Sequence, residues 1–477
     1  MSQLSFRLTL ALLLCGAPGL IGCGHSPAPV PEKLGPNAPS ETQPRSAEDG
    51  KPDVGQVQPA GEATSVQLAS FKAPLAEATW SSFRGPTGMG TTESKGLPTN
   101  WSLTENIAWK VPLPGPGASS PIVFGDRIYI TAYSGFFVPG EEGSKENLTR
   151  HLLSLKRTDG SLIWEQKVAA KLPEEDRIRD HGFAASTPAA DALGVIVFFG
   201  KTGVIAFNHE GNEVWRREVG DQTDGWGSSA SPVIHNDLVF INASVESESL
   251  FALDRKTGEV KWQQKKIRRS WNTPVIVKAA SGREELIVAV QGKVLAFNPE
   301  TGEPLWNCDT DIDWYMVPSV VAADGVVYCL GGRSGNAALA VRAGGSGDVT
   351  DSHRLWTSIK GSNVTSPVYL DKHLYWMHEQ RGVAYCAKVE TGEVTYEERL
   401  ERAGQVYASA LLAEGKIYYL TRDGKVFVIA ATPDFKQLAT NEMMDPSNKS
   451  LLFNGSPAVD GSRLLIRNDK YLYCIGK

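Results

Sequence analysis

The sequence predicts an all-β protein assembled from eight copies of one strand pattern. The first observation is composition, because 12 Trp, 16 Phe, 13 Tyr and 47 Gly among 477 residues suit a turn-rich β protein. The second is a short apolar strand that recurs after a Ser/Thr-Pro pair or its equivalent. Proline is tolerated at the first residue of a strand, where no ladder donor is needed. The strands open at Pro121, Pro188, Pro232, Pro274, Pro318, Pro367, Ala410 and Pro457.

The first 22 residues have the layout of a secretory signal peptide, with Arg7 before the apolar run Leu8–Leu14 and small residues after it. This segment ends in Leu20-Ile21-Gly22-Cys23, which resembles the lipobox of bacterial lipoproteins. The resemblance implies that Cys23 is the first mature residue and carries the lipid, which would anchor an exported protein in the cell envelope. Since Gly24 is not a retention Asp, we expect the outer membrane, facing the periplasm. The alternative is a plain signal peptide with an incidental cysteine.

The chain that follows divides into three predicted segments. Residues 23–78 are rich in proline and small residues and nearly lack aromatics, so they predict a disordered tether between lipid and domain. Residues 79–105 form a preamble that we expect to pack on the repeats. The repeats themselves occupy residues 106–477.

A second motif, A-x-D/N-x-x-T-G-x-x-x-W, lies in the third element of each repeat and is clearest in residues 252–262 and 296–306. An Asp or Asn side chain can hydrogen-bond its own turn and glycine supplies a positive φ, so the motif predicts a hairpin. The Trp then falls on the following strand. Degenerate copies end at Trp164, Trp215, Trp356 and Tyr396.

These repeats resemble the tryptophan-docking repeats of pyrroloquinoline-quinone (PQQ)-type β-propellers, a family that includes quinoprotein alcohol dehydrogenases and the BamB-type outer-membrane assembly lipoproteins. The resemblance implies an eight-bladed β-propeller of four-stranded antiparallel blades, in which each outer-strand Trp stacks on the neighbouring blade. The last repeat reaches only a third strand, and the strand around Trp109 lacks its preceding three. We therefore expect this N-terminal strand to close the eighth blade. The predicted structural docking residues are Trp109, Trp164, Trp215, Trp262, Trp306 and Trp356.

The connections before the openers should converge at the central axis on one face, here called the mouth. Their aromatic rings, amides, His and Arg suit a small polar ligand or a peptide segment. The alternative is that bulky side chains merely plug the channel. The candidate mouth residues are His181, Trp226, Arg269, Trp271, Asn272, Asp313, Trp314, Tyr315, Asn363, Gln405, Tyr407 and Asn454.

Two insertions, residues 134–150 and 165–180, are also expected on the mouth face, the second with a helix start at Pro173–Asp176. Mouth-face connections further supply a set of cations, with Glu246, Glu248 and Glu379 among them. Such a mixture of charges is either a solvated surface or a surface that attracts anions. The cations are Lys201, Lys293, Arg269, Arg333, Arg381 and Arg422.

The formal charge of −6 excludes a polybasic nucleic-acid binder. No phosphate loop, nucleophile elbow or metal-ligand spacing occurs, and Cys308, Cys329, Cys386 and Cys474 predict small buried residues. Quinoprotein dehydrogenases hold quinone and calcium at the mouth with carboxylate and amide ligands, and many have adjacent cysteines, which this chain lacks.

We therefore expect a monomeric, lipid-anchored, non-catalytic propeller of the BamB type that needs no cofactor or metal. It would bind envelope proteins, with a barrel-assembly component as the named candidate. One alternative is a propeller that binds a small ligand or carbohydrate at the aromatic mouth. The second alternative is a PQQ-dependent dehydrogenase with PQQ and calcium.

Overall fold

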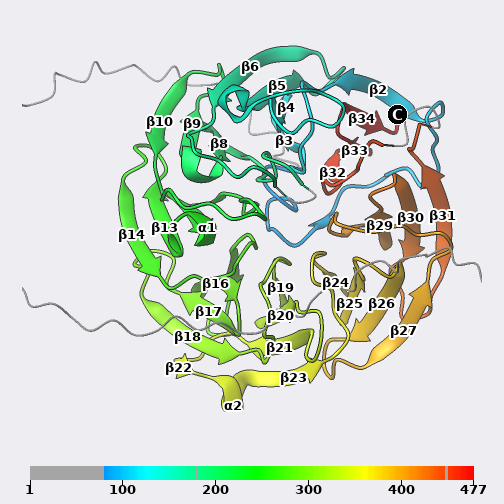
Figure 1. Cartoon of the computed structure of the whole chain (residues 1–477). Coiled ribbons are helices and arrows are strands. Elements are labelled where there is room, and N and C mark those ends of the chain that lie inside the picture. Colours follow the sequence, from blue (N-terminus) through cyan, green and yellow to red (C-terminus); the bar gives the residue numbers. More distant parts are fainter. Residues whose placement is uncertain (1–79, 179–180, 446–449) are drawn as a thin grey trace, which may run out of the picture. The chain divides into compact units, whose positions relative to one another are not determined.

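The computed structural model describes residues 80–178, 181–445 and 450–477. The predicted signal peptide, Cys23 and tether lie outside the described residues. Eight antiparallel sheets surround a central axis (Figure 1), so the predicted eight-bladed β-propeller is confirmed.

Each blade has four antiparallel strands between the axis and the rim, and in blades one to seven these follow chain order from the axis outward. Blade one holds β3 (Ile122–Phe124), β4 (Arg127–Ser134), β5 (Thr149–Lys156) and β6 (Leu162–Ala169). Blade two holds β7 (Ala189–Asp191), β8 (Gly194–Phe198), β9 (Val204–Phe207) and β10 (Glu213–Arg217). Blade three holds β11 (Val233–His235), β12 (Leu238–Ala243), β13 (Ser249–Asp254) and β14 (Val260–Lys265). Blade four holds β15 (Val275–Lys278), β16 (Glu284–Val290), β17 (Lys293–Phe297) and β18 (Pro304–Asp309).

The second half of the ring repeats this plan. Blade five holds β19 (Val321–Ala323), β20 (Val326–Leu330), β21 (Ala338–Arg342) and β23 (Arg354–Ser358). Blade six holds β24 (Val368–Leu370), β25 (His373–Met377), β26 (Val383–Lys388) and β27 (Val394–Arg399). Blade seven holds β28 (Leu411–Ala413), β29 (Lys416–Leu420), β30 (Lys425–Ala430) and β31 (Gln437–Glu442). Blade eight holds β32 (Ala458–Asp460), β33 (Arg463–Arg467) and β34 (Tyr471–Ile475).

The fourth strand of blade eight is β2 (Ile107–Pro112), which pairs antiparallel with β34 and places Trp109 opposite Cys474. The predicted closure by the N-terminal strand is therefore confirmed. It covers the outer edge of β34, gives blade eight the same four strands as the other blades and joins the N-terminal strand to the C-terminal one.

Short elements complete the described residues. Two strands add parallel to existing sheets, β1 (Thr91–Thr92) on β28 and β22 (Gly347–Asp348) on β18. The helical turns are η1 (Lys145–Asn147), η2 (Gly200–Thr202), α1 (Ser244–Ser247) and α2 (Thr350–His353). None of these turns has the length and apolar character needed to cross a bilayer.

The core consists of apolar layers between neighbouring blades, because the middle strands are buried on both faces. All six residues of β12 are buried, whereas β2 at the rim alternates between half-buried and exposed positions. The four cysteines are free and buried, as predicted.

The Asx turns and positive-φ glycines predicted in the hairpins are also present. Asp254 Oδ1 accepts hydrogen bonds from the backbone N–H groups of Lys256 and Thr257, and Gly258 has a φ of 69°.

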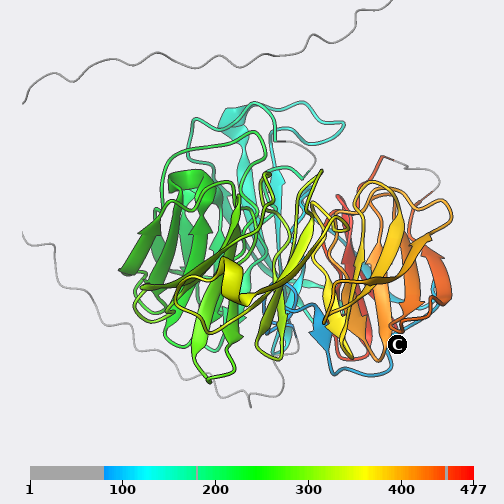
Figure 2. The ribbon, with the colours of Figure 1, turned by 90° about the horizontal axis from the view of Figure 1, so that it is seen from below.

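Residues 80–92 cross the end of the channel opposite the mouth. The backbone of Trp80 bridges to Val123 in blade one, and Gly90 O accepts a hydrogen bond of 2.8 Å from Leu412 N in blade seven. Arg84 is buried and donates to Pro367 O, and burial lowers its pKa to about 9. Figure 2 shows the insertions of blade one on the face of the disc opposite this segment.

Candidate functional site

A belt of hydroxyl groups encircles the axis just below the mouth. In every blade, a Ser or Thr lies two residues before the inner strand, and in blades two to eight its hydroxyl accepts a hydrogen bond from the backbone N–H of its counterpart in the preceding blade. Seven such bonds of 2.9 to 3.2 Å are formed. At the joint between blades eight and one, Ser120 Oγ has no partner among the described residues. The belt residues are Ser120, Thr187, Ser231, Thr273, Ser319, Ser366, Ser409 and Ser456.

The belt corrects one predicted strand opener. In blade five the belt residue is Ser319, so the position equivalent to the other openers is Val320, and β19 begins at Val321. The predicted opener Pro318 therefore lies two residues before the position that opens this strand. The hydroxyl, rather than the proline, is the constant feature because it bonds the adjacent blade.

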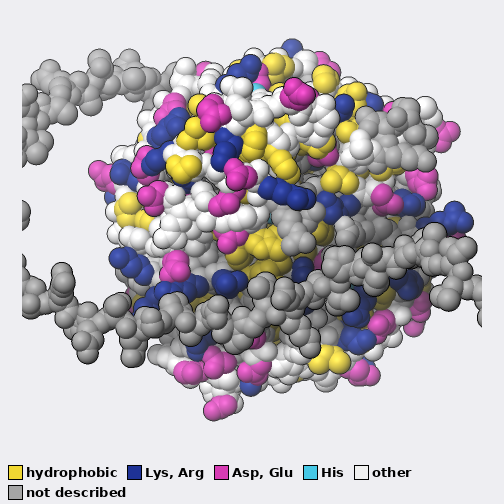
Figure 3. All heavy atoms as spheres, viewed as in Figure 1, with side chains coloured by type: hydrophobic (Ala, Val, Ile, Leu, Met, Phe, Trp, Pro, Cys, Tyr) yellow, Lys and Arg dark blue, Asp and Glu magenta, His cyan; other side chains and the backbone are white. Residues whose placement is uncertain are grey.

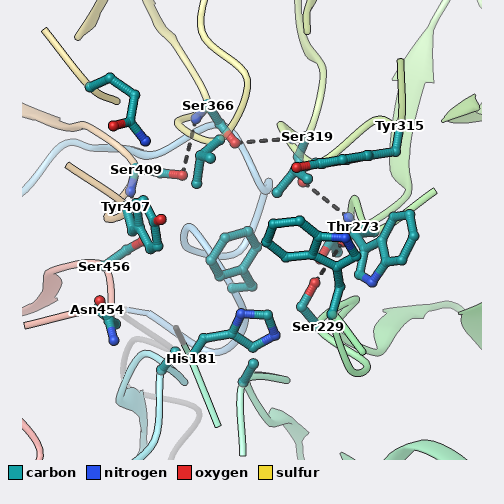
Figure 4. Close-up of a pocket in the computed structure, with 18 of the residues that line it drawn as sticks. His181, Ser229, Thr273, Tyr315, Ser319, Ser366, Tyr407, Ser409, Asn454 and Ser456 are labelled. Carbon is teal, nitrogen blue, oxygen red and sulfur yellow. Dashed lines mark hydrogen bonds between the residues drawn. The ribbon is translucent and has the colours of Figure 1, made fainter. Parts of the chain in front are cut away.

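Above the belt lies a cavity of about 140 Å³ lined mainly by aromatic side chains and hydroxyls (Figure 4). Tyr315 is central: its ring centroid lies 5.4 Å from those of both Trp226 and Trp271. Trp271 is fixed by a 2.7 Å hydrogen bond from Nε1 to Gly227 O. Phe83 also lines the cavity, so the preamble contributes to it. Six predicted mouth residues line this cavity, namely His181, Trp226, Trp271, Tyr315, Tyr407 and Asn454.

Arg422 holds three of the predicted residues in place. Its Nε donates to Asn454 Oδ1 at 2.9 Å and its Nη1 to Gln405 Oε1 at 2.8 Å. Its guanidinium lies 4.2 Å from the ring centroid of Tyr407. Gln405 lines a second, wider hollow above the cavity, which has a volume of about 600 Å³.

The other predicted mouth residues do not line the cavity. Asn272 is buried, and its Nδ2 donates to Ala289 O, so its amide bonds the backbone near the end of β16. The backbone N–H of Asn363 donates to buried Glu379, and Trp314 packs beside Tyr315 at a centroid distance of 5.1 Å. Arg269 and Asp313 are exposed and point to neither hollow.

Sequence reasoning missed the contributions of Phe83, Gln380 and the belt hydroxyls. The repeated Ser/Thr before proline was the available signal for the belt. Arg333, which the sequence singled out for its charge alone, lines both hollows. By contrast, two other cations of that set are engaged, because Lys201 Nζ donates to Pro173 O and Lys293 Nζ contacts Asp309.

The second insertion is held by a buried ion pair between Arg150 Nη2 and Glu174 Oε1, at 2.6 Å. This pairing draws Glu174 inward, and residues 173–176 form no helix, contrary to the prediction. Nearby Glu246 is 1% exposed, and burial raises its pKa to about 7.

Four of the outer-strand Trp residues donate from Nε1 to a backbone oxygen in the turn of the next blade. Trp164 donates to His209, Trp215 to Arg255, Trp262 to Pro299 and Trp356 to Val389, at 2.7 to 3.1 Å.

Two of the Trp residues depart from this arrangement. Trp306 donates to Glu285 Oε2 in its own blade, because residues 343–353 replace the Thr-Gly turn of blade five. Trp109 Nε1 has no partner among the described residues, and Arg157 O instead accepts from Arg463.

The side chains of the described residues that line the cavity do not fit a calcium ion. Calcium takes six to eight oxygen ligands, usually including carboxylates. No described residue that lines the cavity is Asp or Glu. Among residues 80–178, 181–445 and 450–477, no group of three or more His, Cys, Asp and Glu side chains could hold a metal ion.

Comparison with known proteins gives a consistent architecture. A family model described as outer membrane protein assembly factor BamB matches residues 99–241 and 149–397. No curated protein matches the sequence.

Several solved structures share the fold. The crystal structure of BamB from Moraxella catarrhalis is 15% identical, with a TM-score of 0.54 over 77% of this chain and 96% of that one. A quinohemoprotein alcohol dehydrogenase from Comamonas testosteroni is 13% identical, with a TM-score of 0.55 over 83% and 81%. A second quinohemoprotein alcohol dehydrogenase, from Pseudomonas putida HK5, is 13% identical, with a TM-score of 0.55 over 84% of this chain and 80% of that one. At these identities the likeness shows the fold alone.

Proposed function

Because the chain belongs to the family described as outer membrane protein assembly factor BamB, we propose that it is a non-catalytic binding protein of the bacterial envelope. Cys23 would anchor it by lipid to the outer membrane, facing the periplasm, with residues 23–78 as the tether. The propeller would act as a monomer that holds a protein of the barrel-assembly machinery. The observation that supports this proposal most strongly is the family match, which spans residues 99–397.

The donor chemistry of the mouth also favours binding over quinone-dependent oxidation. A dehydrogenase of the quinoprotein type requires calcium ligands and an acidic side chain beside the reacting carbon. The described cavity lining offers hydroxyls, amides, aromatic rings and Arg333 instead. We therefore assign no redox step to this chain.

A small ligand in the mouth is the second candidate function. The aromatic cavity favours it, because Trp226, Trp271 and Tyr315 offer faces on which a sugar or a planar ring can stack. Its volume of about 140 Å³ accepts only a small group.

The test of the main proposal is chemical crosslinking of the tethered protein in intact envelopes, followed by detergent solubilisation and pull-down. Recovery of a barrel-assembly component is the expected result. A Cys23→Ser variant, which should stay in the soluble periplasmic fraction, is the matched control for the anchor. If the wild-type protein sits in the membrane fraction yet recovers no barrel-assembly component, the proposal is wrong.

A further inference from the structure

A trough runs across the mouth face from the axis toward the rim between blades five and six. It consists of the 600 Å³ hollow above the cavity and a second hollow of about 280 Å³. The two hollows share Arg333, His378 and Arg381, so they are continuous. Such volumes exceed what a single small anion needs and match an extended segment of a few residues.

Cations dominate the walls of this trough. Arg177, Arg333 and Arg381 are exposed, and none of them forms an ion pair with a described residue. Figure 3 shows Lys and Arg side chains around the hydrophobic centre of this face. An arginine fork bonds carboxylates in a bidentate manner, so unpaired arginines in a concave surface favour acidic partners.

The two acids along the trough are already engaged. Glu379 is 3% exposed and accepts hydrogen bonds from Ser362 Oγ and Asn363 N, both at 3.1 Å. Glu397 accepts from Lys360 Nζ at 2.6 Å and from the Tyr385 hydroxyl at 3.1 Å. Among the described residues that line the two hollows, Glu379 is the one acid, so Arg177, Arg333 and Arg381 leave the trough with an excess of positive charge.

An aromatic ring holds one of these arginines in place, and an exposed aliphatic side chain adds an apolar contact at the rim. The Arg333 guanidinium lies 5.3 Å from the centroid of the Trp314 ring, which restricts it without neutralising it. At the rim end, Ile359 is 71% exposed beside Lys360. An extended peptide alternates its side chains, so acidic residues can face the arginines while apolar ones face the Ile359 side.

We propose that this trough binds an extended acidic segment of a partner protein, with carboxylates on Arg333 and Arg381 and an apolar side chain near Ile359. This proposal rests on the proposed function, and it states which chemical feature the partner protein would carry, namely an acidic extended segment. It also assigns a role to Trp314, which does not line the cavity but positions Arg333.

The direct test is fluorescence anisotropy of the full chain in detergent with a labelled eight-residue peptide of alternating Glu and Ile. We expect binding that weakens on going from 20 to 200 mM salt, and none by the Lys-Ile peptide. The R333E/R381E variant should lose at least about tenfold in affinity and R333Q/R381Q about threefold. The K256E/K372E variant makes the same charge change on the opposite face and should bind as the wild type does.

Several outcomes would overturn the proposal. These are no binding of the acidic peptide, equal binding by R333E/R381E despite an unchanged melting temperature, or equal binding of a DNA oligonucleotide of the same charge. Crosslinking in envelopes separates the two proposals. If R333E/R381E still recovers the assembly component, the trough assignment fails while the proposed function stands.

Discussion

The indole of Trp109 lies directly on Gly160, so the strand that closes the ring packs against the outer hairpin of blade one, between β5 and β6. A Cβ added to Gly160 would come within 2.7 Å of Trp109 Cε3, and Gly160 has a φ of 72°. The same contact recurs between other blades, where Gly258 meets Trp215 and Gly302 meets Trp262. The ring therefore closes by the same glycine and indole packing that joins its interior blades.

Gly160→Ala should consequently destabilise the propeller by about 2 to 4 kcal/mol, from backbone strain together with the clash. Gly125→Ala is the control, because Gly125 has a φ of 60° but no atom within 4 Å of an added Cβ. It should cost only about 1 kcal/mol. Urea unfolding measures both, and equal losses would show that the indole contact does not matter.

Deletion of the closing strand is a larger test of the same joint. A chain that starts after Leu113 loses β2 and exposes the edge of β34. We expect a melting temperature lower by more than about 10 °C and concentration-dependent aggregation. Differential scanning calorimetry of the truncated and the mature chains measures this difference. Equal melting temperatures would refute closure as a source of stability.

The sequence predicted the ring well because its signals are local and repeated. Residues 252–262 and 296–306 carry the hairpin chemistry in their own side chains, and the lone strand at Trp109 indicated how the ring closes. The pocket was harder to predict because it depends on which loop side chains turn inward. Asn272 and Asn363 resembled ligand groups in the sequence, yet they bond the chain's own groups. Phe83 reaches the axis from a segment with no repeat pattern.

Glu285, in the second strand β16, should be the most sensitive acid of blade four. Its side chain is fully buried, and its two oxygens accept from Arg283, Trp306 and the backbone of Gly344. Glu285→Gln places an amide N–H against one of these donor groups and should cost about 2 to 4 kcal/mol. Glu284→Gln is the adjacent control, since the Glu284 side chain is 47% exposed and should change stability by less than about 1 kcal/mol. Similar losses in urea unfolding would contradict this account.

Glu246 makes stability depend on pH. Burial raises the pKa of its carboxyl from 4.5 to about 7, so the folded state holds the proton more tightly than the unfolded state does. Its contribution is therefore full below about pH 4.5 and is lost as the pH rises to about 7, by about 3 kcal/mol in total. Urea unfolding at pH 5 to 8 measures how the free energy of unfolding falls with pH. Glu246→Gln should remove this fall, whereas Glu248→Gln should keep it because the Glu248 side chain is 44% exposed. A slope that survives in Glu246→Gln would assign the effect to another group.

The last prediction concerns the quinone, because enzymes that use it share this fold. Calcium and PQQ added to the full chain should produce neither dye-linked alcohol oxidation nor a rise in melting temperature. The reason is that no described residue in the cavity lining carries a carboxylate, and Phe83 occupies part of the lining. A ligand that binds only the folded state at 100 times its Kd would stabilise it by about 2.7 kcal/mol, which thermal melting resolves easily. A saturable, calcium-dependent shift with oxidation would establish the enzyme, and a shift without oxidation would show that the mouth retains ligand binding alone.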